Sequence, residues 1–169
     1  MNTFLKSVVS GLAGAAALNL WHETIRRVVP EAPRADILGE RSLQKIMRAV
    51  GKTPPADEED LYGPAMVADL LSNTAYYSLI GTARPEHAYP VGAALGLAAG
   101  VGALVLPGPW GLGKAPTNRT TATQVMTVGW YLLGGLVTAA VYTRLAERPV
   151  ASSDETGEPT DAPTETPDS

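Results

Sequence analysis

The chain contains no cysteine and only two histidines. The absence of cysteine excludes a disulfide framework, a thiolate nucleophile and a cysteine-ligated metal site. With so few histidines, a zinc site would have to take most of its ligands from carboxylates. The sequence therefore predicts no metal and no other cofactor.

Charged residues are missing from long parts of the chain, although they make up 18% of the whole. Residues 88–113 carry no charged side chain over 26 positions, and residues 122–142 are also uncharged. A hydrocarbon core of about 30 Å needs about 20 apolar residues in a helix. These runs predict helices that cross a membrane, and the polar remainder explains why the mean hydropathy of the chain is only +0.02.

The pattern of apolar runs predicts an all-α integral membrane bundle. We place four transmembrane helices in one domain of residues 1–146, at about 4–24, 61–83, 88–107 and 122–144. Gly92, Gly96 and Gly100 form a GxxxGxxxG pattern, which lets another helix approach closely. Gly11 and Gly134 are further close-packing positions. We expect these glycine faces to pack against a second copy or another membrane protein.

Two polar segments accompany the bundle. Residues 36–51, in the first connection, place Leu43, Ile46 and Met47 on one face of a helix and basic residues elsewhere. This amphipathic segment is either a helix that lies on the cytoplasmic membrane surface or a cap on the end of the bundle. Residues 147–169 contain almost no large apolar side chain, so we predict a disordered acidic tail.

Polar side chains also occur inside the predicted spans. An ionisable group inside a span costs about 3 kcal/mol or more unless it is paired, protonated or facing water. Counted along the helices from the cytoplasmic side, the groups of the first and second spans reach a similar depth. The candidate buried polar cluster consists of Asn19, His22, Glu23, Asp69 and Asn73. The cluster is either a structural hydrogen-bond network or a site for a proton, an ion or a small ligand. For Glu23 there is a simpler alternative, an ion pair with Arg27 one helical turn later.

One apparent nucleotide-binding motif lacks its structural context. Residues 108–114 read GPWGLGK and fit the pattern GxxxxGK. Ala115 and Pro116 follow, where a phosphate-binding loop needs Ser or Thr and an uninterrupted helix. We expect no nucleotide at this loop, and no feature of the chain predicts contact with nucleic acid.

The first 40 residues resemble a pattern found in small bacterial multi-span inner-membrane proteins. The residues that carry the resemblance are 19–23 (NLWHE) and 32–39 (APRADILG). The resemblance implies a multi-span protein of the bacterial inner membrane. This family has no established activity to transfer.

Basic residues predict the orientation. The first and third connections hold nine of the 13 Lys and Arg residues, whereas the N-terminus, the second connection and the C-terminal flank hold four. Because basic loops favour the cytoplasm, we predict that both of these connections lie inside and both termini outside.

Three functional classes follow from these patterns. The leading interpretation is a non-enzymatic membrane module that packs or interacts in the lipid bilayer. The second is a small transporter or proton- or ion-handling protein that uses the polar cluster around Asp69, and the third is a membrane-embedded enzyme.

Overall fold

The computed structural model describes residues 1–57, 59–113 and 115–147. Within these ranges the chain is helical and has no strand, which confirms the all-α class for this part. The elements are α1 (Thr3–Ile25), α2 (Ala35–Ala49), α3 (Glu59–Tyr77), the 3-10 helices η1 (Ser78–Thr82) and η2 (Pro85–His87), α4 (Ala88–Val105), α5 (Ala115–Asn118) and α6 (Thr121–Glu147). The predicted acidic tail, residues 147–169, lies outside the described residues except for Glu147, where α6 ends.

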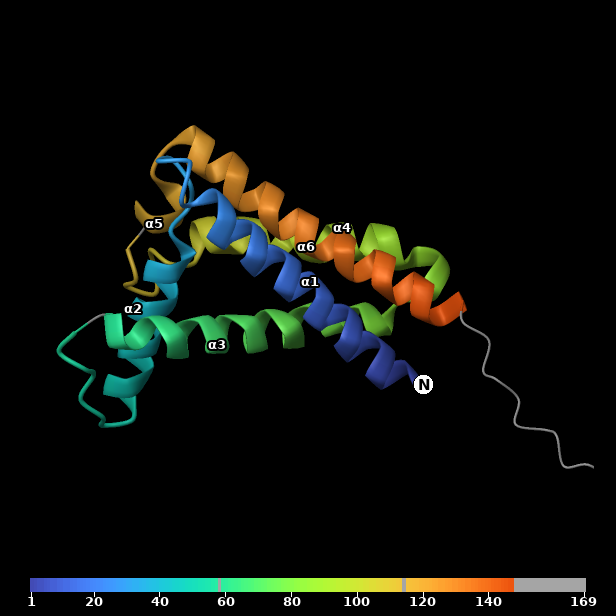
Figure 1. Ribbon diagram of the computed structural model, residues 1–169, viewed down its shortest axis with the longest axis horizontal. Coiled ribbons are helices and arrows are strands. Elements are labelled where there is room, and N and C mark those ends of the chain that lie inside the picture. The colour runs from blue at the N-terminus through green and yellow to red at the C-terminus, as the bar shows by residue number, and fades with distance from the viewer. Residues whose placement is uncertain (58, 114, 148–169) are drawn as a thin grey trace, which may run out of the picture.

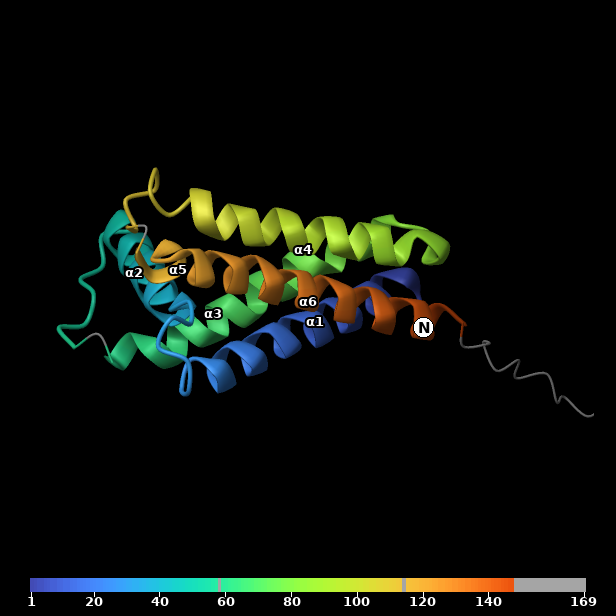
Figure 2. The same cartoon turned by 90° about the horizontal axis from the view of Figure 1, so that it is seen from above.

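The helices α1, α3, α4 and α6 lie along the long axis of the molecule and alternate in direction (Figures 1 and 2). Helix α6 packs against α1 and α4, and α3 packs against α1. The short helices α2 and α5 lie where α1 ends, and we call this the α2 end. The N-terminus and the end of α6 share the opposite end (Figure 1). Each long helix therefore joins the same two ends.

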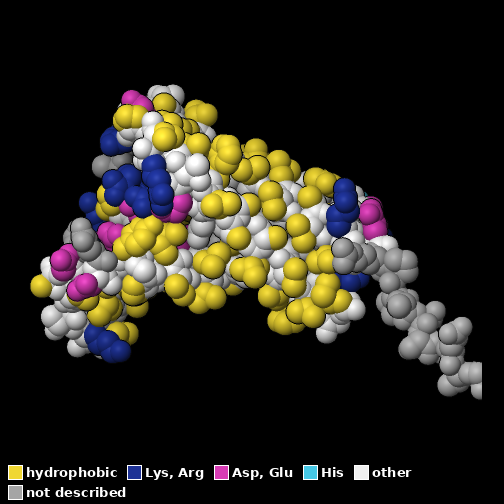
Figure 3. Space-filling model, viewed as in Figure 1, with side chains coloured by type: hydrophobic (Ala, Val, Ile, Leu, Met, Phe, Trp, Pro, Cys, Tyr) yellow, Lys and Arg dark blue, Asp and Glu magenta, His cyan; other side chains and the backbone are white. Residues whose placement is uncertain are grey.

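Many large apolar side chains point outward, and many small or polar side chains are buried. Phe4 is 75% exposed, Leu20 72% and Val125 67%, whereas Ser10 and Thr138 are fully buried. Apolar side chains cover the middle of the face shown in Figure 3, and charged side chains gather at its two ends. A water-soluble protein buries its large apolar side chains, so this arrangement is typical of a bundle that faces lipid.

Among the residues that the structure describes, three helical segments are long and apolar enough to cross a membrane: Thr3–Ile25, Pro85–Val105 and Thr121–Glu147. They indicate an integral membrane location, and the shorter α2 lies between the first two. The second span predicted at 61–83 is not among them. Asp69 and Asn73 lower the hydropathy of α3, Pro64 lies inside it, and the chain continues from Ser78 as a 3-10 helix.

The glycines noted in the sequence are all buried within this one chain: Gly11, Gly92, Gly96, Gly100 and Gly134. The clearest case is Gly96 of α4. A Cβ atom there would lie 2.6 Å from the carbonyl oxygen of Tyr131 and 2.7 Å from the Cα of Leu132. Since both are backbone atoms of α6, glycine is what allows α4 and α6 to approach this closely.

Helix α2 covers the α2 end and packs against α3 and α5. Leu43 and Met47 are partly buried there. Ile46 of the same helix is 59% exposed, and Val50, which follows its last residue, is 65% exposed. The amphipathic segment is thus a cap on the bundle, and one apolar edge of it remains uncovered.

Candidate functional site

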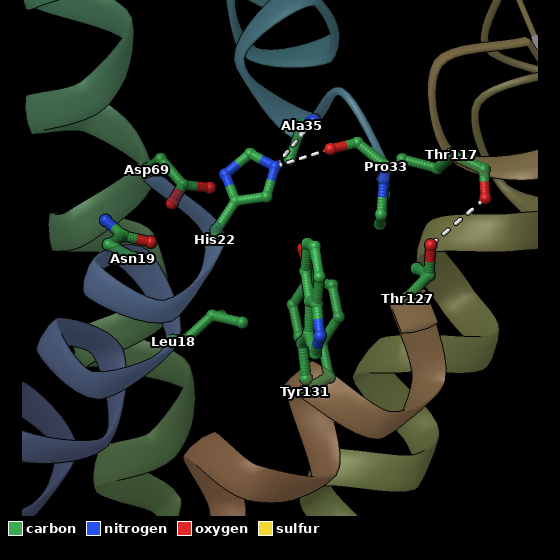
Figure 4. A pocket seen from close by; sticks show the side chains of 10 residues that line it. Leu18, Asn19, His22, Pro33, Ala35, Asp69, Thr117, Thr127 and Tyr131 are labelled. Carbon is green, nitrogen blue, oxygen red and sulfur yellow. Dashed lines mark hydrogen bonds between the residues drawn. The ribbon is translucent and has the colours of Figure 1, made fainter. Parts of the chain in front are cut away.

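A small cavity near the α2 end brings together polar residues of α1 and α3 (Figure 4). Asn19 and His22 of α1 and Asp69 of α3 form one side of it. The remaining lining residues are Leu18, Pro33, Ala35, Thr117, Thr127, Trp130 and Tyr131. The cavity has a volume of about 20 Å³, which is room for about one water molecule.

His22 ties α1 to the connection that follows it. Its Nε2 lies 2.7 Å from the carbonyl oxygen of Pro33 and 3.3 Å from the backbone nitrogen of Ala35. A carbonyl oxygen can only accept, so the short contact assigns the proton of a neutral imidazole to Nε2. Trp130 packs edge-on against the ring, with 5.4 Å between ring centroids. The buried histidine is thereby held in one orientation.

Asp69 completes the polar side of the cavity. Its carboxylate lies near the side-chain amides of Asn19 and Asn73, which favour its charged form, and it interacts electrostatically with His22. Figure 4 shows the carboxylate turned toward the imidazole. Donors around a carboxylate reduce the cost of burying it, since its oxygens keep hydrogen-bond partners. The four residues therefore form one polar group between α1 and α3.

Glu23 lies in a different group, so the structure divides the cluster predicted from the sequence. Its carboxylate accepts hydrogen bonds from Arg26 at 2.6 and 2.9 Å and from the hydroxyl of Tyr62 at 2.8 Å. The expected partner one turn later, Arg27, is farther away at 3.4 Å. Arg26 also lies over the ring of Tyr62, 5.6 Å from its centroid. Glu23 thus joins α1 to α3 outside the cavity.

Asp36, at the start of α2, extends this second group. Arg34 donates to both of its carboxylate oxygens at 2.7–3.0 Å, and Arg26 lies 3.4 Å away. Burial by itself raises the pKa of Asp36, but the hydrogen bonds and charge of Arg34, the backbone N–H of Ile37 and the charge of Arg26 outweigh it. The net result is a pKa below the ordinary value for aspartate.

We call the residues of this second group the charged cluster: Glu23, Arg26, Arg34, Asp36 and Tyr62. Sequence reasoning missed it as a unit. The one available signal was the Arg-x-Asp spacing of Arg34 and Asp36. Tyr62 had no signal, because it is 39 residues from the carboxylate to which it donates.

The connection between α1 and α2 is also held from the other side of the bundle. Thr123 donates to the carbonyl oxygen of Glu31 at 2.8 Å, and Arg119 donates to that of Pro30 at 2.6 Å. The backbone N–H of Arg34 donates to a carbonyl oxygen of α5 at 2.7 Å. These bonds hold the cavity walls in place.

The chemistry available in the cavity is limited to hydrogen bonding and proton movement between Asp69 and His22. Among the described residues, no group of three or more His, Cys, Asp or Glu side chains could hold a metal ion. This cavity is the size of one water molecule and does not admit an organic substrate, although Asp69 also lines a hollow of about 260 Å³ toward α2.

Comparisons with known proteins add no information about function. No protein-family model, curated protein or solved structure matches the chain. The functional argument therefore depends on the geometry of the chain itself.

Proposed function

We propose that this chain is a non-enzymatic, four-span membrane module of the bacterial inner membrane, in which the polar group around Asp69 is structural. The observation that carries the proposal is that Asn19, His22 and Asp69 meet at a cavity of only about 20 Å³. The carboxylate of Asp69 has amide partners, and His22 is committed to Pro33. In a bilayer, such pairing holds α1, α3 and the first connection together without a ligand.

The direction of the chain supports a fourth crossing by α3. Helix α1 ends at the α2 end, whereas α4 begins at the opposite end (Figure 1). If α1 and α4 both cross the membrane, the chain must cross once more between them, and α3 is the element that makes this passage. Its outward side chains are apolar, with Val67 58% exposed and Leu71 63%. Asp69 and Asn73 lower the hydropathy of α3, and Asn73 is buried inside the bundle.

The distribution of basic residues supports a cytoplasmic α2 end. The first and third connections, which hold nine of the 13 Lys and Arg residues, both lie there. Basic connections are retained on the cytoplasmic side, so both termini are outside in this proposal. The bacterial inner membrane follows from the resemblance of residues 19–23 and 32–39.

Cysteine labelling tests the four crossings, because the chain has no cysteine of its own. Thr53→Cys lies in the connection before α3, and Glu86→Cys lies in η2 after it; both positions are exposed. In spheroplasts, a membrane-impermeant maleimide should label Glu86→Cys at once and Thr53→Cys only after lysis. Labelling of both positions from the same side would show that α3 does not cross.

Interaction with other proteins, where it occurs, must use surfaces other than the glycine faces, because helices of the same chain already occupy these. Lipid-facing side chains of α1, α4 and α6 are available for such contacts. Oligomer formation through the glycines would require the bundle to open.

Proton handling is the second candidate, and the carboxylate of Asp69 turned toward the imidazole of His22 favours it (Figure 4). Asp69→Asn separates the two functions. In the structural role the amide keeps the hydrogen bonds and removes a buried charge, so stability should be unchanged or higher. In the proton-handling role it should abolish proton flux into vesicles that contain the protein, at unchanged abundance, and Asp69→Glu should keep part of the flux.

A further inference from the structure

A lateral groove separates α3 from α4. Both views show the two helices diverging toward the α2 end (Figures 1 and 2). At the narrow end, the hydroxyl of Tyr76 donates to the carbonyl oxygen of Leu95 at 2.9 Å and joins α3 to α4. Elsewhere in the described residues the two helices hardly touch, because α4 packs on α6 and α3 on α1.

The part of the groove between α3 and α4 is a hollow of about 380 Å³. It adjoins a hollow of about 490 Å³ between α2 and residues 109–112, and one of about 260 Å³ between α2 and α3. Ser42 of α2 lines all three, which makes them parts of one space. Its wall on α4 is formed by small apolar residues such as Ala99 and Gly102, its wall on α3 includes the polar Ser72 and Asn73, and Tyr131 of α6 lies at its base. Each hollow is far larger than the cavity at His22 and approaches or falls within the range of ligand pockets, about 300–1,000 Å³.

The mouth of the groove, at the α2 end, is basic and aromatic. Lys45 and Trp110 line it together with the apolar edge of α2. The ammonium of Lys45 donates to the carbonyl oxygen of Trp110, and Arg41 donates to that of Leu112 at 2.9 Å. These bonds place both cations at the mouth and leave each with further N–H donors for an anion. Trp and basic side chains are the residues that meet phospholipid headgroups.

We propose that the groove holds one anionic phospholipid, with an acyl chain between α3 and α4 and the phosphate at Lys45 and Arg41. The inference rests on the proposed four crossings, since the groove opens into hydrocarbon only when α3 and α4 both span. The acyl chain would lie along the apolar wall on α4, where its burial contributes favourably with every methylene. The positive mouth lies on the cytoplasmic side, where anionic lipids create a negative surface potential.

To test this proposal, lipid is added to the delipidated full chain in detergent, and the bound lipid is measured by native mass spectrometry. The probes are phosphatidylglycerol and phosphatidylcholine with identical acyl chains. Wild type should bind one phosphatidylglycerol in preference to phosphatidylcholine. Lys45→Gln should reduce that preference by about fivefold, the effect of one basic residue at a membrane surface. The matched control is Arg48→Gln on the same helix, which does not line the groove and should leave the preference unchanged.

Filling the groove tests the place of the acyl chain. A Cβ at Gly102 meets only the side chain of Leu106, at 3.5 Å, so Gly102→Leu fits locally and projects into the space. It should weaken binding of both lipids at least tenfold, because it displaces several methylenes. Gly129→Leu adds the same side chain on the exposed face of α6, where a Cβ meets nothing within 4 Å, and should bind as wild type does. Ala99→Leu, on the same wall as Gly102, should repeat the loss, and thermal unfolding of each variant confirms that it is folded.

Three outcomes would overturn the lipid assignment. The wild-type chain could bind no added lipid, or Gly102→Leu could bind lipid as well as wild type does. In the third outcome the chain forms a dimer that Gly102→Leu dissociates, which would make a second copy the occupant of the groove. If cysteine labelling of the same preparation in vesicles shows that α3 crosses the membrane, each of these outcomes contradicts only the lipid proposal and leaves the four-span arrangement intact. If labelling shows that α3 does not cross, the proposed four-span arrangement fails first.

Discussion

Nε2 of His22 lies 2.7 Å from the carbonyl oxygen of Pro33, eleven residues later in the chain. Both groups are buried, and the bond turns the chain back against the end of α1. This single contact links a membrane helix to the connection that leads into α2. It makes His22 a structural residue at the entrance to that connection.

His22→Ala should destabilise this connection. The buried carbonyl of Pro33 loses its donor, which costs about 1–3 kcal/mol of unfolding free energy. Hydrogen exchange of residues 28–38 in detergent should increase, while that of α4 stays the same. His87→Ala is the matched control, since His87 is exposed in η2 at the opposite end. Equal exchange in both variants would contradict the structural role of His22.

Gly96→Ala should destabilise the packing of α4 on α6. The added methyl would lie 2.6 Å from a backbone oxygen, so the helices must move apart. Overpacking of this kind costs about 1–3 kcal/mol. Gly129→Ala, where nothing lies within 4 Å, should be neutral or stabilising by up to about 1 kcal/mol through helix propensity. Thermal unfolding in detergent measures the stability of both variants. Equal melting temperatures for Gly96→Ala and Gly129→Ala would show that the Gly96 face of α4 is not packed against α6.

Stability should fall in acid through Asp36. Its pKa in the folded protein lies below the ordinary value of 3.8, so the unfolded chain takes up the proton first as the pH falls. The stabilisation is fully present above pH 3.8 and is lost as the pH falls through the lower folded value. Unfolding midpoints between pH 6 and about pH 2 should decrease more in wild type than in Asp36→Asn. Asp60→Asn, at an exposed position in the first turn of α3, should retain the wild-type pH dependence.

The protein should remain in the membrane fraction after washing with alkaline carbonate. Three apolar segments, Thr3–Ile25, Pro85–Val105 and Thr121–Glu147, bury their side chains in lipid and resist extraction. A peripheral protein of known behaviour, added to the same membranes, provides the control for complete washing. Recovery of the chain in the supernatant would remove the membrane interpretation altogether.

The long uncharged runs determined most of the helical architecture. The spans expected at 4–24 and 122–144 correspond to Thr3–Ile25 and Thr121–Glu147, because helix length in a bilayer follows from hydropathy alone. The region expected at 61–83 forms α3 and η1, and it is not among the segments that are long and apolar enough to cross a membrane. Asn73 of α3 is buried and Asp69 is partly buried. Packing against the other helices is therefore what lets the polar segment α3 lie beside helices that face lipid.

Helical spacing and a common depth placed Asn19, His22 and Asp69 within reach of one another, and the structure brings them to one cavity. The same reasoning assigned Glu23 to this group, whereas Arg26 and Tyr62 hold it elsewhere. Depth along a helix can be counted from the sequence. The side of the helix that meets a neighbour depends on rotation, which interhelical packing sets.

The longer-range partners in the charged cluster were decided by tertiary structure. Asp36 lies ten residues from Arg26, across the connection between α1 and α2, and Tyr62 lies 39 residues from Glu23, with α2 between them. The groove between α3 and α4 likewise has no sequence signal, because it exists only where two helices pack on different neighbours and leave a space. Local patterns specify which residues form a helix and how polar each face is, whereas contacts between distant segments arise from the balance of packing and desolvation over the whole bundle.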